Sequence, residues 1–160
     1  MPNDYFQFKQ FLVKQDRSSF KVGTDGVLLG AWASVEHTRS ILDVGTGTGL
    51  IALMLAQRAT AGTMASDMGI VALEIEKNAC EQARENVRIS PWNQWIRVIN
   101  QSFQDYCGTG PAMFDLIVSN PPFFRESWKP DRQEKEISRH DTLLSLKELV
   151  SGVGELLARE

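Results

Sequence analysis

Short apolar runs alternate along the chain with longer stretches whose apolar residues recur at helical spacing. Four runs bounded by turn-forming or polar residues predict buried strands, at residues 40–44, 70–75, 95–100 and 114–119. Three stretches predict helices, at residues 50–58, 78–89 and 143–159. Because strands that alternate with helices pair in parallel with right-handed crossovers, the pattern predicts an α/β fold with a mostly parallel sheet.

The segments outside this alternation have different patterns. Residues 5–13 are apolar with partial alternation, which predicts a short strand or one arm of a hairpin. Residues 21–32 begin with turn formers and continue as an apolar helix that Asp25 could cap. Residues 124–141 are polar and mixed in charge, so we expect a loop there.

Composition narrows the class of protein. The 160 residues are 42% hydrophobic and 23% charged, as expected for one globular domain. No apolar run approaches the roughly 20 residues that span a bilayer, and the N-terminus lacks the pattern of a signal peptide. The two cysteines lack the spacing of a zinc site or a disulfide framework. We therefore expect a cytoplasmic monomer that needs neither a metal nor a membrane.

A glycine-rich loop joins the first predicted strand of the alternation to its helix. Gly45, Gly47 and Gly49 have the spacing G-x-G-x-G, which allows a tight turn and a close approach of backbone to a ligand. Asp43, just before them, suits a positively charged ligand and is a poor neighbour for a pyrophosphate. Glu74, at the end of the second strand, is placed to accept ribose hydroxyls, with Glu76 as the competing candidate. The alternative interpretations are a tight turn without a ligand and surface glutamates.

These residues resemble the class I S-adenosylmethionine-dependent methyltransferases. The segment Asp43-Val44-Gly45-Thr46-Gly47-Thr48-Gly49 is similar to their glycine motif, and Ala72-Leu73-Glu74 to their acidic motif. The resemblance implies a Rossmann-like three-layer sandwich and S-adenosylmethionine as cofactor. It also implies that Ser102 and Phe103 lie against the adenine ring, although many members have aspartate where Ser102 stands.

The segment Asn120-Pro121-Pro122-Phe123 follows the fourth predicted strand and is the most specific feature of the sequence. Consecutive prolines hold a rigid extended turn. The carboxamide oxygen of Asn120 and the carbonyl of Pro121 can each accept one N–H of a planar amine, and Phe123 can stack on its ring. Such positioning directs the nitrogen lone pair at a methyl donor without a strong base. The alternative is a proline turn that closes a strand above a buried phenylalanine.

The motif resembles that of methyltransferases acting on adenine N6, guanine N2 or the side-chain nitrogen of glutamine. The resemblance also implies that Asn120 lies beside the cofactor. A second resemblance narrows the choice, since residues 8–11 and 21–32 are similar to the start of bacterial tRNA adenine-N6 methyltransferases, which modify the adenosine beside the anticodon of a valine tRNA. It implies that Lys21, Gly23 and Thr24 lie near the methionine end of the cofactor. A helix cap is the alternative role for Thr24.

Charge adds little to the choice of substrate. The net charge of −3 does not indicate nucleic-acid binding, although a local basic patch would be enough. Basic residues follow the proline motif, but acidic residues are interleaved with them, so a solvated loop is the alternative there. The basic residues are Arg125, Lys129, Arg132, Lys135 and Arg139.

The leading hypothesis is therefore methyl transfer from S-adenosylmethionine to N6 of an anticodon-loop adenine in tRNA. We expect one domain over residues 1–160, with residues 1–35 as a segment over substrate and cofactor and residues 36–160 as the core. The class I fold has seven strands and only four are found here, so we expect a C-terminally truncated form that lacks the last strands. The alternatives are methylation of a protein glutamine or another nucleobase amine, and a non-catalytic domain that binds RNA or cofactor.

Overall fold

The computed structural model describes residues 3–61, 68–109, 113–121 and 144–158. Its central sheet has four parallel strands in the order β5-β4-β3-β6. These strands are β3 (Ser40–Val44), β4 (Gly69–Glu74), β5 (Ile96–Asn100) and β6 (Leu116–Ser119). A separate antiparallel hairpin is formed by β1 (Tyr5–Gln7) and β2 (Leu12–Lys14).

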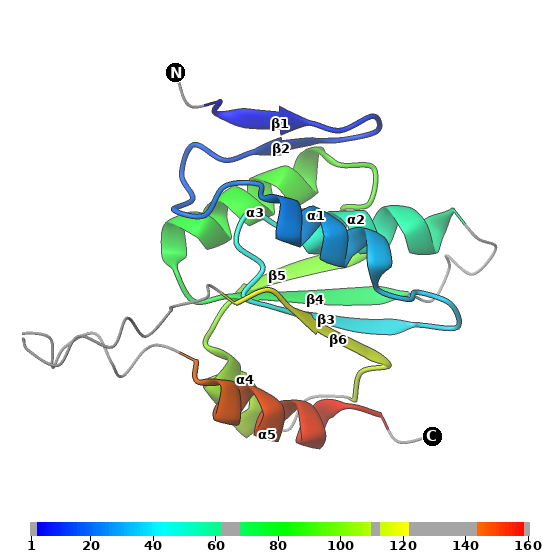
Figure 1. The fold of residues 1–160 in the computed structure, drawn as a ribbon, viewed down its shortest axis with the longest axis vertical. Helices are drawn as coiled ribbons and strands as arrows, with labels where there is room; N and C mark the ends of the chain where they lie inside the picture. Colours follow the sequence, from blue (N-terminus) through cyan, green and yellow to red (C-terminus); the bar gives the residue numbers. More distant parts are fainter. Residues whose placement is uncertain (1–2, 62–67, 110–112, 122–143, 159–160) are drawn as a thin grey trace, which may run out of the picture.

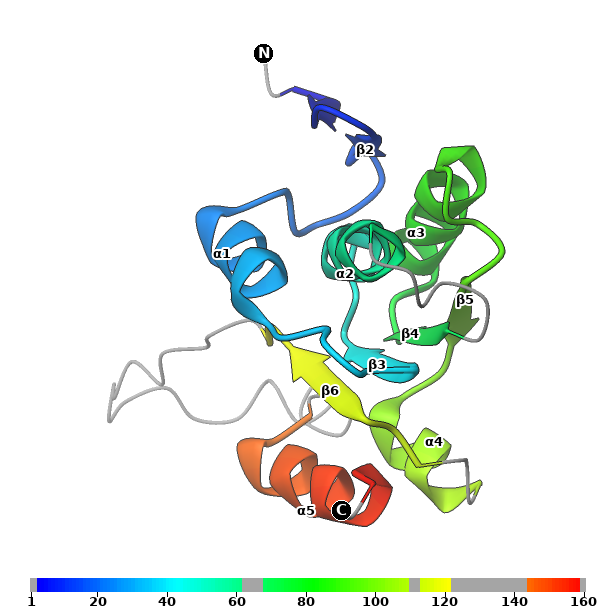
Figure 2. The same ribbon diagram turned by 90° about the vertical axis from the view of Figure 1, so that its right-hand side faces the viewer.

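Helices cover both faces of the sheet (Figures 1 and 2). On one face lie α1 (Thr24–Trp32), α2 (Leu50–Thr60) and α3 (Lys77–Ile89). On the other face lie α4 (Phe103–Gly108) and α5 (Leu146–Leu156). The predicted fold class, a Rossmann-like α/β three-layer sandwich with a parallel sheet, is confirmed.

Each face of the sheet has its own hydrophobic core. Apolar residues of α2 pack with Ile41, Ile70 and Val118 on the first face. On the second face Leu42, Val44 and Leu73 pack with residues of α4 and α5. Since side chains alternate along a strand, neighbouring residues such as Ile41 and Leu42 supply the two separate cores. This burial on both faces explains why the strands are continuous apolar runs in the sequence.

The element boundaries differ from the predicted ones where capping decides them. Helix α5 begins at Leu146, three residues later than predicted, because Ser145 and Glu148 form a capping box. The prediction that Asp25 caps α1 is wrong, because the N-cap is Gly23 and no side chain bonds there. Helix α4 was not predicted. The loop expected at residues 124–141 lies outside the described residues, as do the basic residues of that segment.

The chain leaving α5 returns to the sheet beside β6. Phe114 N–H donates to the carbonyl of Leu156 at 2.8 Å, and Ala158 N–H donates to the carbonyl of Phe114 at 2.9 Å. Asp115, the next residue, donates to Ser40 of β3 instead. Because alternate residues of a strand bond to opposite neighbours, residues 157–158 run parallel to the chain on the side of β6 away from β3. Among the described helices, none has the length and apolarity needed to cross a bilayer.

Candidate functional site

The carboxyl ends of the strands gather most of the polar residues that the sequence singles out. Strand order reverses between β3 and β6, since β4 and β5 extend the sheet on one side of β3 and β6 lies on the other. Val44 is in register with Leu73 of β4 and with Ser119 of β6. The glycine loop, Glu74 and Asn120 therefore follow these paired residues at one edge of the sheet. A crevice at such a reversal is the usual ligand position in α/β sheets.

The glycine loop has the backbone shape that its glycines permit. Gly45, Gly47 and Gly49 have φ values of 72°, 58° and 84°, in the left-handed region that L side chains rarely adopt. A methyl group placed on Gly45 or Gly47 would have no neighbouring atom within 4 Å. At Gly49 it would meet Ala83 of α3 at 3.5 Å. The first two glycines thus leave the loop open to a ligand, while the third allows close packing of α3.

Asp43 lies beneath this loop and is completely buried. Its Oδ2 accepts a hydrogen bond of 2.6 Å from the Thr46 hydroxyl, whereas Oδ1 has no partner among the described residues. Burial raises the pKa of Asp43 to about 6, against the opposing hydrogen bond from Thr46. An incompletely paired carboxylate in a buried position favours a cationic group nearby.

Glu74 and Glu76, the two candidates for a ribose-binding carboxylate, have different surroundings. Glu74 is 9% exposed, and its two oxygens accept from the N–H groups of Gly47 at 2.8 Å and Glu76 at 2.9 Å. Glu76 is the N-cap of α3, and its side chain accepts from Asn78 N–H and Ala79 N–H. The carboxylate of Glu74 therefore lies at the glycine loop, and that of Glu76 completes a helix end.

Asn120 and Pro121 are partly exposed at the end of β6. Helix α1 crosses close to them, because a methyl group placed on Gly26 would lie 3.6 Å from Nδ2 of Asn120. The adjacent Ser119 hydroxyl donates to the carbonyl of Val44 at 2.9 Å and ties this end of β6 to β3. Pro122 and Phe123 of the predicted motif lie outside the described residues.

Lys21, Gly23 and Thr24 lie on the path into α1 and are exposed. Gly23 has extended backbone as the N-cap, and Thr24 is the first helical residue. Since Gly26 of the same turn lies next to Asn120, this segment passes beside the carboxyl edge of the sheet.

Ser102 and Phe103 lie at the start of α4, where Ser102 caps the helix and Phe103 is its first residue. The Ser102 hydroxyl accepts from Asp105 N–H at 3.0 Å and donates to the Asp105 carboxylate at 2.7 Å. The Phe103 side chain is 4% exposed and belongs to the second core. The ring therefore packs within this core, and its predicted stacking on an adenine ring stays a prediction.

Two buried amide side chains to which the sequence assigned no role lie on α3. Gln82 and Asn86 are both fully buried and bond to the backbone of the N-terminal segment. Their separation of four residues, on the face of α3 that also carries Ala79 and Ala83, places both on the packed side of the helix. The sequence feature that could have indicated these buried amides is their spacing of four residues on the helix face that carries the small residues.

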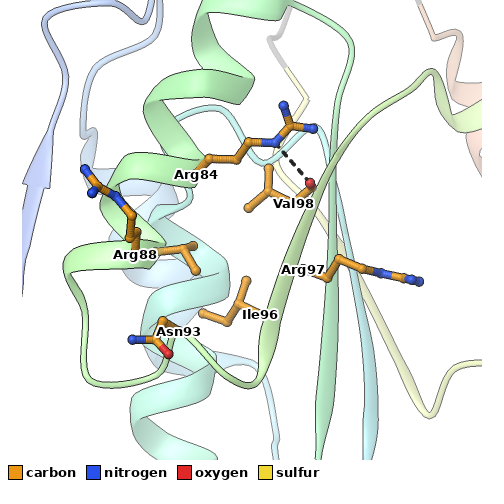
Figure 3. A pocket seen from close by; sticks show the side chains of 7 residues that line it. Arg84, Arg88, Asn93, Ile96, Arg97 and Val98 are labelled. Atoms are coloured by element: carbon orange, nitrogen blue, oxygen red, sulfur yellow. Dashed lines mark hydrogen bonds between the residues drawn. The ribbon is translucent and has the colours of Figure 1, made fainter.

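A hollow of about 330 Å³ lies away from this site, between the second half of α3 and the first half of β5 (Figure 3). Arg84, Arg88 and Arg97 line it, and Arg84 donates to the carbonyl of Val98 at 3.3 Å. None of the candidate residues lines this hollow. Within the part of the chain that the structure describes, no group of three His, Cys, Asp or Glu residues is placed to hold a metal ion.

Comparison with known proteins shows one family match. The model of the methyltransferase small domain matches residues 19–141. The tRNA1(Val) (adenine(37)-N6)-methyltransferase of Bacteroides thetaiotaomicron is 52% identical over 160 residues, which are 100% of this chain and 65% of the relative. The protein of the same name from Bacteroides fragilis is 48% identical over 99% of this chain and 64% of the relative. The chain thus spans slightly less than two thirds of the length of these relatives.

Solved structures show the same fold. An O-methyltransferase from Bacillus cereus aligns with a TM-score of 0.53 and 24% identity, over 66% of this chain and 48% of that protein. A putative RNA methyltransferase from Pyrococcus horikoshii aligns with a TM-score of 0.52 and 16% identity, over 82% of this chain and 53% of that protein.

Proposed function

We propose a function for this chain, which belongs to the methyltransferase small domain family. The site at the carboxyl ends of its sheet strands transfers a methyl group from S-adenosylmethionine to N6 of an adenine in tRNA. The observation that carries the proposal is the juxtaposition of the open glycine loop with Asn120 where strand order reverses. The names of relatives at 52% and 48% identity support adenine N6 in a valine tRNA as the acceptor.

The residues at this edge fit S-adenosylmethionine. The unpartnered Oδ1 of Asp43 suits a positively charged ligand, and Gly45 and Gly47 leave open space for one. The Glu74 carboxylate accepts one N–H on each oxygen and has remaining lone pairs for ribose hydroxyls. When bound, the cofactor supplies a methyl group attached to a positively charged sulfur.

Asn120 and Pro121 provide acceptors for the substrate amine. The lone pair of an exocyclic adenine nitrogen is delocalised into the ring, so this nitrogen is a weak nucleophile. The Oδ1 of Asn120 and the carbonyl of Pro121 each accept one N–H, which favours tetrahedral nitrogen and directs its lone pair. Transfer would leave the methyl group on this nitrogen, which would release its surplus proton to water, and the demethylated cofactor would leave the site. An anticodon-loop adenine is already unpaired, so its extrusion into the site costs little.

Incubation with labelled S-adenosylmethionine and unmodified tRNA tests the proposal. Nuclease digestion of the product should release labelled N6-methyladenosine. Label in guanine, or in a glutamine of an added protein extract, would overturn the assignment of adenine and favour the alternative acceptors. Cofactor binding without labelling of any acceptor would favour a non-catalytic domain.

Replacement of Asn120 tests the chemistry at the acceptor nitrogen. We expect Asn120→Ala to lower the rate of methyl transfer by about 100-fold or more, as removal of one oriented polar group does in other enzymes. Cofactor affinity should stay within about tenfold, or 1.4 kcal/mol, of the wild type. Asn93→Ala, beside the distant hollow, is the matched control and should keep both properties. Joint loss of turnover and cofactor affinity would instead assign Asn120 a structural role.

A further inference from the structure

Asn86 of α3 connects three parts of the molecule through one buried side chain. Its Oδ1 accepts from Lys14 N–H at 2.9 Å. Its Nδ2 donates to the carbonyl of Lys14 and to the carbonyl of Thr48, both at 2.8 Å. Lys14 ends β2, and Thr48 lies in the glycine loop. Both amide hydrogens of Asn86 are therefore used to hold the glycine loop beside the N-terminal segment.

Gln82, one turn earlier in α3, also bonds to the backbone of the N-terminal segment, but among the described residues it does not bond to the glycine loop. Its Oε1 accepts from Arg17 N–H at 2.9 Å. Glu85 adds ion pairs to the side chains of Lys14 and Arg17. Because both basic side chains are more than 40% exposed, these ion pairs contribute little. The buried amides therefore define where residues 14–17 lie on α3.

The same N-terminal segment reaches the candidate site again farther along the chain. After Arg17 it passes through Lys21 and Gly23 into α1, where Gly26 lies next to Asn120. Residues 14–26 thus run from a position beside the glycine loop, at Lys14, to a position beside Asn120, at Gly26. Asn86 fixes the first of these two positions.

We propose that Asn86 is a positioning residue that sets the affinity for S-adenosylmethionine by holding the glycine loop against the N-terminal segment. The inference rests on the proposed function for the identity of the ligand. Thr48 is 5% exposed, so loss of the Asn86 amide leaves its carbonyl in a buried setting without that partner. The loop then relaxes in the free protein, and ligand binding must order it again.

A pair of variants on α3 separates this role from simple destabilisation. Asn86→Leu and Gln82→Met each remove one buried amide that holds the N-terminal segment, but only the first removes the bond to the loop. We expect Asn86→Leu to weaken S-adenosylmethionine binding in calorimetry by about tenfold, or 1.4 kcal/mol. Gln82→Met should change the affinity by less than about threefold, and thermal unfolding of both variants measures how far each is destabilised.

Asn86→Asp is the second variant, for the case that Asn86→Leu does not fold. It keeps the shape of the side chain and the acceptor for Lys14 N–H, but its ionised form can donate to neither the Thr48 nor the Lys14 carbonyl. Hydrogen exchange of the amides of residues 45–50 gives a readout that needs no ligand. Exchange should be faster in both Asn86 variants than in Gln82→Met.

Two results would overturn the proposal. One is an equal loss of S-adenosylmethionine affinity in the Asn86 and Gln82 variants. The other is an unchanged rate of hydrogen exchange at residues 45–50 in the Asn86 variants. A wild-type protein that binds no S-adenosylmethionine would overturn the proposed function instead. The exchange comparison would then still decide whether Asn86 orders the loop.

Discussion

Asp43 is in an environment that opposes its charged form. It is fully buried, and burial raises its pKa to about 6 from the ordinary value of 3.8. A carboxyl group with a raised pKa stabilises the folded state at low pH, where it is protonated in both states. That contribution is lost as pH rises through about 6, because ionisation is then easier in the unfolded chain. Near neutral pH, the ionised Asp43 therefore lowers the free energy of unfolding, although its charge suits a cationic ligand.

Replacement of this carboxylate should separate stability from binding. Asp43→Asn keeps an oxygen for the Thr46 hydroxyl and cannot ionise. At pH 8 we expect the variant to be more stable than the wild type by up to about 3 kcal/mol, with the difference shrinking as pH falls toward 5. Its affinity for S-adenosylmethionine should fall, because the negative charge beneath the glycine loop is lost. Thermal unfolding at several pH values and calorimetry measure the two effects. A stability difference that does not vary with pH would contradict this account of Asp43.

The positions of several predicted site residues in the sheet follow from the local sequence. The glycines and Asp43 belong to one strand and turn, and Glu74 and Asn120 directly follow apolar strands that pair with it. Their gathering at one edge follows from the parallel sheet alone. The roles of Gln82 and Asn86 depend on backbone groups 65 and 72 residues away, which no local pattern reveals. The burial of Phe103 depends likewise on α5, at a distant point of the chain.

Among the elements, the strands of the sheet, four of the helices and the N-terminal strand region were predicted, whereas the short helix α4 was not. The strands of the sheet and helices α2, α3 and α5 have enough residues for periodicity to be recognised. Helix α4 has six residues, fewer than two turns, and its capping by Ser102 was the remaining local signal. The start of α1 was misjudged because an extended glycine, with no capping side chain, precedes it.

Helix α5 offers a test of how closely the second face of the sheet is packed. A methyl group on Gly152 would lie 2.5 Å from Cε1 of Phe103 and 2.9 Å from Sγ of Cys107. We expect Gly152→Ala to destabilise the protein by about 1–3 kcal/mol, because overpacking outweighs the better helix propensity of alanine. Gly154→Ala in the same helix meets no atom within 4 Å and should stabilise by up to about 1 kcal/mol. Urea unfolding of both variants measures the difference, and equal effects would refute close packing of α5 on α4.

At the scale of the whole molecule, the candidate site joins segments that are far apart in the chain. The sheet supplies the glycine loop, Glu74 and Asn120, while the N-terminal segment reaches the same edge through β2 and α1. The parallel sheet could be derived from the alternation of elements, whereas its strand order comes from the structure. The path of residues 14–26 could not, because it depends on contacts between side chains of α3 and backbone of the N-terminal segment.

Since one ligand would contact several of these segments, its binding should stabilise the fold as a unit. At a concentration 100 times its dissociation constant, a ligand that binds only the folded state adds about 2.7 kcal/mol. For a chain of this size that corresponds to a rise in Tm of roughly 5–10 °C. We expect S-adenosylmethionine to produce this shift, and a mixture of adenosine and methionine at the same concentration to produce much less, because two separate molecules lose the advantage of linkage. Scanning calorimetry with and without the ligand measures it, and the shift should shrink in Asn86→Leu and persist in Asn120→Ala. An unchanged Tm at saturating ligand would contradict cofactor binding by this chain, whatever its fold.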